Sequence, residues 1–254
     1  HLPLQAPAEY VEKCMDRYKV GYDVLRKQRF EKQKRLGLIP DNMELPIFNK
    51  EFNGKRPSWN ELTPEQQEKW IKDMATYAAM IEIMDEGIGQ VIKELKKKNM
   101  YENTVFLFMS DNGATDEGGF IGQLMSDLSN TPYRSYKKWV FQGGTSSPLI
   151  LCYGNKSKNL QKGKVCSQPA HIIDIMPTCM ALGNVSYPKT FSHADLPGTN
   201  LLPATTGQSV HKRTLYFEHQ SSCAIIEGNW KLVKTDRNSQ WELIDLSKDP
   251  FETH

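Results

Sequence analysis

The stretch FLFMSDNGATDEGG, from Phe106 to Gly119, decides how the rest of the sequence is interpreted. Its apolar run ends at Ser110 and is followed at once by Asp111, Asn112 and Gly113. Asn-Gly is a strong turn signal, and an aspartate before it can cap a turn. At the carboxyl end of a buried strand, however, the same residues would lie where open α/β sheets bind their ligands. The stretch is therefore either a turn or the rim of a site.

The segments on either side predict an α/β fold. Residues 104–109 form an apolar run typical of a strand covered on both faces. A long helix precedes this strand, because residues 63–66 supply an N-cap, a proline at the first helical position and a capping-box glutamine. A helix followed closely by a buried strand indicates an α/β sheet. Residues 148–153 repeat the buried-strand pattern, and residues 169–182 predict another helix.

Residues 8–36 predict one helix, since apolar residues recur at spacings of three and four. It carries the basic run RKQRFEKQKR, Arg26 to Arg35, whose glutamate and glutamines favour a solvated face over a nucleic-acid footprint. Residues 38–62, with three prolines and a glycine, predict a long loop. The helix after that loop carries an apolar stripe that we expect in the core: Trp70, Met74, Tyr77, Ile81, Met84, Ile88, Val91 and Leu95.

The character of the sequence changes after about Thr206. Short alternating runs cover residues 214–218, 224–234 and 241–245 and are separated by polar, turn-forming residues. This pattern predicts a small antiparallel meander of three strands. We therefore expect two domains, residues 1–206 and residues 207–254, the second truncated at its end.

The composition excludes few classes of protein. The chain has 254 residues, of which 39% are hydrophobic and 24% charged, with a formal net charge of +2. Without a run of about 18 apolar residues or a strong basic excess, we expect no membrane span and no nucleic-acid partner. The five cysteines show no metal-finger spacing, so we expect mostly buried thiols. The sequence does not indicate the oligomeric state. We expect that both ends of the chain are truncated.

Adjacent carboxylate and amide oxygens, as in Asp111 and Asn112, suit a hard cation such as Ca²⁺ or Mg²⁺. A complete site needs further carboxylates. The segment NTPYRSYKKWVFQGG, residues 130–144, places Arg134, Lys137 and Lys138 near the same sheet edge, before a glycine pair that we expect to be flexible. A metal ion with a lysine beside it would bind a dianionic ester, although a single lysine is more often a surface charge.

Four segments in this order resemble motifs of one family: the opening HLPLQAP, the SDNG stretch, NTPYRSYKKWVFQGG, and WELIDLSKDP at residues 241–250. The sequence resembles the sulfatases, of the arylsulfatase type within the alkaline phosphatase superfamily. The resemblance implies an α/β fold, a partial alkaline-phosphatase-like sandwich of a mixed sheet between helices with a small C-terminal antiparallel β subdomain. It implies that Asp111 and Asn112 bind the metal and that His1 and Lys137 contact the sulfate ester.

The resemblance also implies substrates and a location. The expected partner is a sulfated small molecule or glycan, and the expected location is periplasmic or secreted. It further implies that residues 171–178 form a structural helix in which His171 and Asp174 cap and pack instead of binding a ligand. Glu218 and His219 are candidates for catalytic groups, but a pair of this kind more often has no catalytic role.

Two family features are missing. Sulfatases use a formylglycine that is made from the cysteine or serine of a C/S-x-P-x-R motif. In this sequence, the only segment with that spacing begins with Asn130, which cannot form the aldehyde. The second pair of metal-binding aspartates is also absent from this sequence. We therefore expect that the N-terminal portion of the enzyme is absent from this chain and that the chain alone is inactive. The alternatives are a phosphate or phosphonate ester hydrolase of the same superfamily, and a pseudoenzyme that only binds sulfated glycans.

Overall fold

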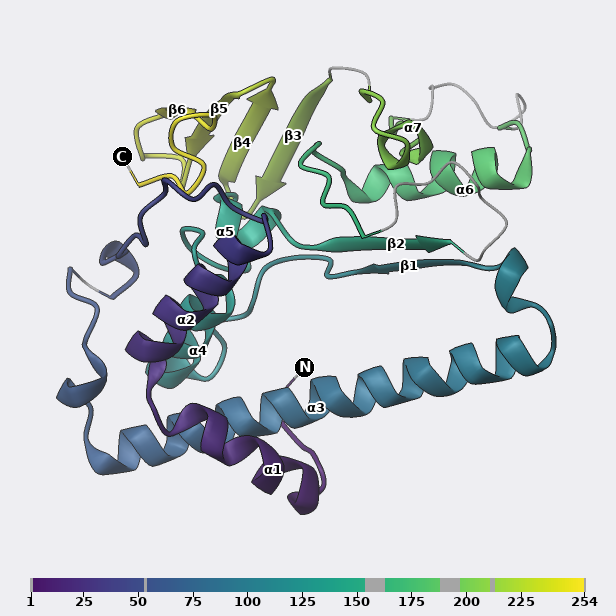
Figure 1. Ribbon diagram of the computed structural model, residues 1–254. Helices are drawn as coiled ribbons and strands as arrows, with labels where there is room; N and C mark the ends of the chain where they lie inside the picture. The colour runs from purple at the N-terminus through teal and green to yellow at the C-terminus, as the bar shows by residue number, and fades with distance from the viewer. Residues whose placement is uncertain (1, 53, 154–162, 188–196, 211–212, 254) are drawn as a thin grey trace. The chain divides into compact units, whose positions relative to one another are not determined.

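The computed structural model describes residues 2–52, 54–153, 163–187, 197–210 and 213–253 (Figure 1). These residues form two compact units. The first unit takes residues 1–101, 112–148 and 214–254, and the second takes residues 102–111 and 149–213. The first unit includes the shorter elements η1 (Lys50–Phe52), η2 (Trp59–Glu61), α4 (Gly119–Ser129) and α5 (Gln142–Thr145).

A break at Gly21 divides the N-terminal helical region. Helix α1 covers Ala8–Tyr18 and helix α2 covers Tyr22–Arg35, so the prediction of one continuous helix is wrong. Gly21 has a φ of +80°, and a Cβ at this position would lie 2.5 Å from the indole ring of Trp59. Glycine is needed here for both the backbone conformation and the close approach, and the chain turns as a result.

The longest helix, α3, covers Pro64–Lys97 and begins where the sequence predicts. The Oγ1 atom of Thr63 accepts a hydrogen bond from the Gln66 N–H at 3.3 Å, and the Gln66 side chain accepts one from the Thr63 N–H at 3.0 Å. This reciprocal capping box satisfies two of the amides that a helix start leaves free. The long loop predicted before it is also present, interrupted only by η1 and η2 among the described residues.

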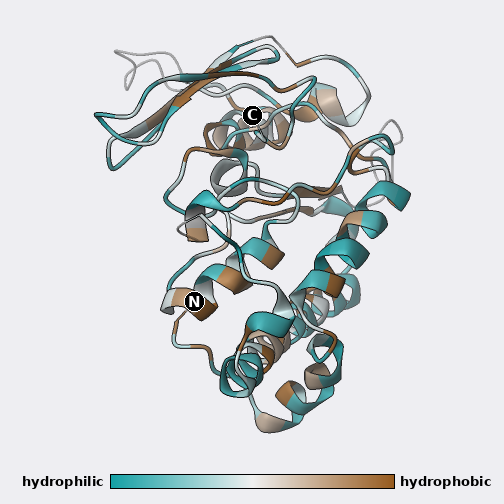
Figure 2. Ribbon diagram, turned by 90° about the vertical axis from the view of Figure 1, so that its left-hand side faces the viewer, coloured by the Kyte–Doolittle hydropathy of each residue, from teal (hydrophilic) through white to brown (hydrophobic). Residues whose placement is uncertain are grey.

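Only the first half of the apolar stripe on α3 belongs to the core. Trp70 and Met74 are fully buried, whereas Ile81, Met84 and Val91 have exposed fractions of 42%, 45% and 56%. Helix α1 packs along the alanines of the first half, and apolar residues recur among polar ones along the helical ribbons (Figures 1 and 2). The prediction of a core stripe along the whole helix is wrong for this chain, because the described neighbours bury only one half.

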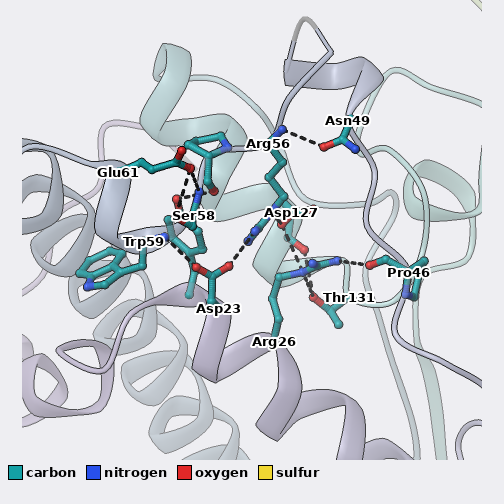
Figure 3. Close-up of polar contacts among 12 residues, drawn as sticks. Asp23, Arg26, Pro46, Asn49, Arg56, Ser58, Trp59, Glu61, Asp127 and Thr131 are labelled. Carbon is teal, nitrogen blue, oxygen red and sulfur yellow. Dashed lines mark hydrogen bonds and ion pairs between the residues drawn. The ribbon is translucent and has the colours of Figure 1, made fainter.

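The basic run of α2 is not simply a solvated face, because Arg26 is only 3% exposed. Its Nε atom lies 3.2 Å from Oδ2 of Asp127 and 3.4 Å from Oγ1 of Thr131. Arg56 donates to the same Asp127 oxygen at 2.7 Å and to Asp23 at 2.7 Å (Figure 3). Two guanidinium groups thus share one buried carboxylate, which ties α2 and the following loop to the end of α4.

The C-terminal sheet has four strands, not the predicted three: β3 (Thr214–His219), β4 (Ser222–Glu227), β5 (Trp230–Lys234) and β6 (Glu242–Asp245). The strands are antiparallel in the order β3-β4-β5-β6. The run expected over residues 224–234 is a hairpin, because Gly228 takes a φ of +59° at the turn. One face of the sheet packs on Val140 and Phe141. That these strands form a separate domain, residues 207–254, stays a prediction.

The second unit is built on two strands, β1 (Val105–Met109) and β2 (Leu149–Tyr153), both near their predicted positions. They pair antiparallel, with Phe106 opposite Cys152. Burial on both faces, expected from the apolar runs, is not found in the described part of the chain, where Phe108 and Ile150 are 41% and 57% exposed. A sheet is buried on both faces only where other elements pack on each side of it.

The rest of the second unit comprises η3 at its border (Tyr101–Asn103), η4 (Ile172–Asp174), α6 (Ile175–Gly183) and α7 (Leu202–Thr205). The chain is therefore a mixed α/β protein with antiparallel sheets, as predicted in class. Of the cysteines, only Cys14 is buried, and Cys152, Cys166 and Cys179 are exposed, so the expectation of mostly buried thiols is wrong. No helix within the described ranges is long and apolar enough to cross a membrane.

Candidate active site

The candidate site residues lie at the end of β1 and in a turn after α4. Asp111 is exposed and Asn112 half-buried, and both follow β1 directly, as predicted. Lys137 is exposed, and no carboxylate among the described residues pairs with its ammonium group. His1 lies outside the described residues. The interpretation of the SDNG stretch therefore depends on what holds it in place.

Backbone hydrogen bonds join the SDNG loop to the segment that carries Lys137. The Gly113 N–H donates to the Gly144 carbonyl at 2.9 Å, and the Lys137 N–H donates to the Ala114 carbonyl at 2.8 Å. The hydroxyl of Ser126, on α4, donates to the carbonyl of Thr115. The loop is thus fastened on three sides, and the backbones of Asn112 and Lys137 belong to one hydrogen-bonded frame.

Asn130 is the centre of this frame. Its Oδ1 atom accepts a hydrogen bond from the Ala114 N–H at 3.0 Å, and its Nδ2 atom donates to the carbonyls of Ser135 at 3.0 Å and Gly143 at 2.9 Å. One side-chain amide therefore satisfies three backbone groups from three segments. Asn130 occupies the first position of the formylglycine-like spacing, and its role in this structure is to hold the loop.

The three glycines of the frame are required by space. A Cβ on Gly113 would lie 1.8 Å from the Gly143 carbonyl oxygen, and one on Gly143 would lie 2.0 Å from the Ser135 oxygen. A Cβ on Gly144 would lie 2.0 Å from the Trp139 oxygen. The expectation that Gly143 and Gly144 provide flexibility is wrong: they lie in α5, buried, where backbones approach too closely for a side chain.

The three cations of this segment have different environments. Lys138 forms an ion pair with Asp116 at 2.9 Å, and its backbone takes a φ of +77°. Arg134 is buried and pairs with Glu242 on β6 at 2.8 Å, so its charge already has a partner, and its expected place near the sheet edge stays a prediction. Its guanidinium lies 3.8 Å from the centre of the Phe141 ring. Lys137 is the cation of this segment that remains exposed and unpaired among the described residues.

A buried ion pair contacts the start of helix α5. Lys231 on β5 and Glu252 are both fully buried, with 2.6 Å between Nζ and Oε1. The other oxygen of Glu252 accepts a hydrogen bond from the Gln142 N–H, the first amide of α5. Burial raises the pKa of Glu252 and lowers the pKa of Lys231, and their mutual attraction opposes both shifts.

His171 and Asp174 cap and pack, as the sequence analysis expects. The His171 N–H donates to Asp174 at 2.7 Å, and the Thr199 N–H donates to its other oxygen at 2.9 Å. Arg213 forms an ion pair with the same carboxylate. Burial alone would raise the pKa of Asp174, but these hydrogen bonds and the Arg213 charge lower it below its ordinary value of 3.8. The pKa of His171 is lowered mainly by burial.

Glu218 and His219 point to opposite faces of β3, because side chains alternate along a strand. Both are exposed, and Nδ1 of His219 lies 3.1 Å from the Lys138 carbonyl oxygen. The structure therefore brings His219 to the turn that carries Lys137, a relation that sequence spacing does not show. Asn130 and Glu252 are the other site-supporting residues that the sequence analysis missed. Asn130 lies in a segment that it singled out, and Glu252 lies two residues beyond the end of another.

The donor chemistry at Asp111 and Asn112 fits a hard cation only in part. A carboxylate and a neighbouring amide are oxygen donors of the kind that Ca²⁺ and Mg²⁺ take. Among the residues described here, no three His, Cys, Asp or Glu side chains come together as a metal site. The pair can therefore contribute two ligands, and a complete coordination shell needs others.

The model of the sulfatase family matches residues 1–185 of this sequence. An uncharacterized sulfatase of Schizosaccharomyces pombe is 33% identical over 291 aligned positions, which cover 99% of this chain and 51% of that protein. The arylsulfatase of Klebsiella aerogenes is 29% identical, over 76% of this chain and 46% of the enzyme. The chain thus belongs to the sulfatase family, of the alkaline phosphatase superfamily, and spans about half the length of the curated relatives it matches.

The fold agrees with this assignment. The crystal structure of Ps i-CgsB in complex with k-i-k-neocarrahexaose superimposes with a TM-score of 0.58, covering 92% of this chain and 50% of that one. Sequence identity is 24%, so this likeness shows the fold alone. It confirms the predicted alkaline-phosphatase-like class.

Proposed function

We propose that this chain supplies the C-terminal part of the active centre of an enzyme that hydrolyses sulfate esters of aryl or carbohydrate substrates. The observation that carries the proposal is the backbone link between the SDNG loop and the Lys137 turn. A simple hairpin turn would need no such support, whereas a binding site needs its groups held in fixed geometry. The family membership supports a sulfate ester as the bound group.

In this proposal Lys137 binds the sulfuryl group and balances the negative charge that develops on its oxygens. Two features support that role: the ammonium group is exposed, and the Lys137 amide is bonded to the loop that carries Asn112. His1 would hydrogen-bond the ester oxygen and assist its departure as a positioned acid. We assign it from the sequence alone.

Asp111 and Asn112 would hold a Ca²⁺ or Mg²⁺ ion together with oxygen ligands beyond those described here. When bound, such an ion polarises the sulfate oxygens as a Lewis acid. The chain's own contribution is the hydrogen bond from the Gly113 N–H to the Gly144 carbonyl, which holds the backbone next to Asn112. A formylglycine nucleophile is part of the proposal, but the sequence of this chain holds no C/S-x-P-x-R motif to form it. We therefore propose that the chain alone does not turn over.

The test compares Lys137→Ala with Lys97→Ala in the full-length protein that contains this chain. Lys97 is a matched control because its ammonium is exposed at the far end of α3. Lys137→Ala should lower kcat/KM for an aryl sulfate or a sulfated sugar by about 10²- to 10³-fold, as when one group that stabilises the transition state is lost. Lys97→Ala should leave it unchanged.

Three results would contradict the proposal. Full activity of Lys137→Ala would show that this lysine does not act on the sulfate. A clear preference of the parent enzyme for the matching phosphate or phosphonate ester would favour the related hydrolase class. Binding of sulfated glycans without any turnover by the full-length protein would indicate a pseudoenzyme.

A further inference from the structure

We infer that His219 is a positioning residue that holds the Lys137 turn by donating a hydrogen bond from Nδ1 to the carbonyl oxygen of Lys138. This inference rests on the proposed role of Lys137. The atoms concerned are 3.1 Å apart, within hydrogen-bond range. The two residues are 81 positions apart in sequence, and the contact reaches the residue directly after Lys137.

The identity of the acceptor determines the tautomer of the ring. A carbonyl oxygen can only accept a hydrogen bond, so Nδ1 of His219 must carry the proton. In the neutral ring Nε2 is then the unprotonated nitrogen, because the partner of one ring nitrogen sets the state of the other. The bond to Lys138 therefore fixes both the direction of the imidazole and its tautomer.

The turn needs such support. Lys138 adopts a φ of +77°, in the left-handed region that residues with a side chain rarely occupy. Residues in this conformation persist when their surroundings hold them in place. Lys138 is held at both ends, because its ammonium pairs with Asp116 at 2.9 Å and its carbonyl meets His219. The N–H of Lys137 is bonded to Ala114 in addition.

Strand β3 is itself fixed against the segment that follows the turn. Phe217, two residues before His219 and on the same face of the strand, packs against the cluster of Val140 and Phe141. Glu218 lies on the opposite face. His219 therefore ends a strand that is anchored by the packing of Phe217 two residues earlier, and a positioning group needs such support.

The experiment uses four variants of the full-length protein. Asparagine carries an N–H donor at the δ position, as His219 does, whereas glutamine carries its donor one atom further out, in the place of Nε2. His219→Ala and His219→Gln should each lower kcat/KM about 5-fold, equivalent to one hydrogen bond of ~1 kcal/mol. His219→Asn should stay within about twofold of the parent. Glu218→Ala, the neighbour on the other face of β3, should match the parent.

A double-mutant cycle separates positioning from other roles. If His219 acts through Lys137, the change His219→Ala should have almost no further effect in a Lys137→Ala background. The full loss in that background would overturn the inference, and so would rescue by glutamine but not by asparagine. An unchanged rate for His219→Ala would overturn it as well. Full activity of Lys137→Ala would instead refute the proposed function, so the two failures can be distinguished.

A spectroscopic measurement tests the hydrogen bond without activity. Long-range ¹H–¹⁵N spectra of the histidine rings at alkaline pH distinguish Nδ1–H from Nε2–H, and the signal of His219 is the one that His219→Asn removes. We expect the Nδ1–H pattern. An Nε2–H pattern would overturn the inference whatever the kinetics show.

Discussion

Replacing Gly113 by alanine should displace the SDNG loop and destabilise the protein. The added Cβ would lie 1.8 Å from the carbonyl oxygen of Gly143 and 3.1 Å from the Cα of Gly144. Real Cβ atoms essentially never come closer than 3.0 Å to such an atom. Both neighbours are backbone in a buried helix, α5, so they cannot rotate away as a side chain could.

The magnitude follows from this geometry. The loop and α5 must separate by about 1 Å, which breaks the 2.9 Å hydrogen bond from Gly113 to Gly144. Overpacking of a tight site costs about 1–3 kcal/mol, and the lost hydrogen bond about 1 kcal/mol more. We therefore expect the free energy of unfolding to fall by about 2–4 kcal/mol. A shift of this size beside Asn112 should also lower kcat/KM of the full-length enzyme about 10²-fold.

Equilibrium urea unfolding, followed by tryptophan fluorescence, measures the change in stability. Gly89→Ala is the matched control, because Gly89 lies inside α3 with nothing within 4 Å of its Cβ position. This substitution should raise stability by about 0.5–1 kcal/mol, since alanine loses less backbone entropy in a helix. If Gly113→Ala were as stable and as active as Gly89→Ala, the close contact with α5 would not exist in solution and the rigid frame would be disproved.

Two further predictions concern buried charges. Glu252→Gln should lower the free energy of unfolding by about 3–5 kcal/mol because it leaves Lys231 buried without its partner. Adding Lys231→Met should recover most of that loss. Equal stabilities of the parent and Glu252→Gln in urea would contradict this prediction. The lowered pKa of Asp174 stabilises the fold above about pH 4, and this stability is lost as the pH falls through the folded-state pKa. Asp174→Asn should therefore show a flatter fall of melting temperature with acid, and parallel curves for the two proteins would count against the ion pair.

Local signals predicted the regular elements well. The start of α3 follows from the Thr63 capping box, and β1 and β2 lie within one residue of their apolar runs. Capping by His171 was predicted from the family resemblance. Each of these features depends on residues only a few positions apart, so the sequence displays it directly.

Long-range packing overturned the other expectations. Arg26 looked like a solvated cation because its buried acceptors, Asp127 and Thr131, lie more than 100 positions away along the chain. The end of the helix at residue 18 follows from the Trp59 ring against Gly21, again a distant partner. The apolar stripe of α3 could not show by itself that only half of it meets a neighbour.

The sequence by itself determined the sulfatase family, the strand end that carries Asp111 and Asn112, and the choice of Lys137 as the candidate cation. The tertiary structure alone decided what these residues rest on: Asn130 bonding three segments, Gly113 against α5, and His219 at the Lys138 carbonyl. The physical reason is that a sequence motif specifies only which side chains follow one another along the chain. Hydrogen bonds and close approaches depend on distances between segments, and these exist only once the chain has folded.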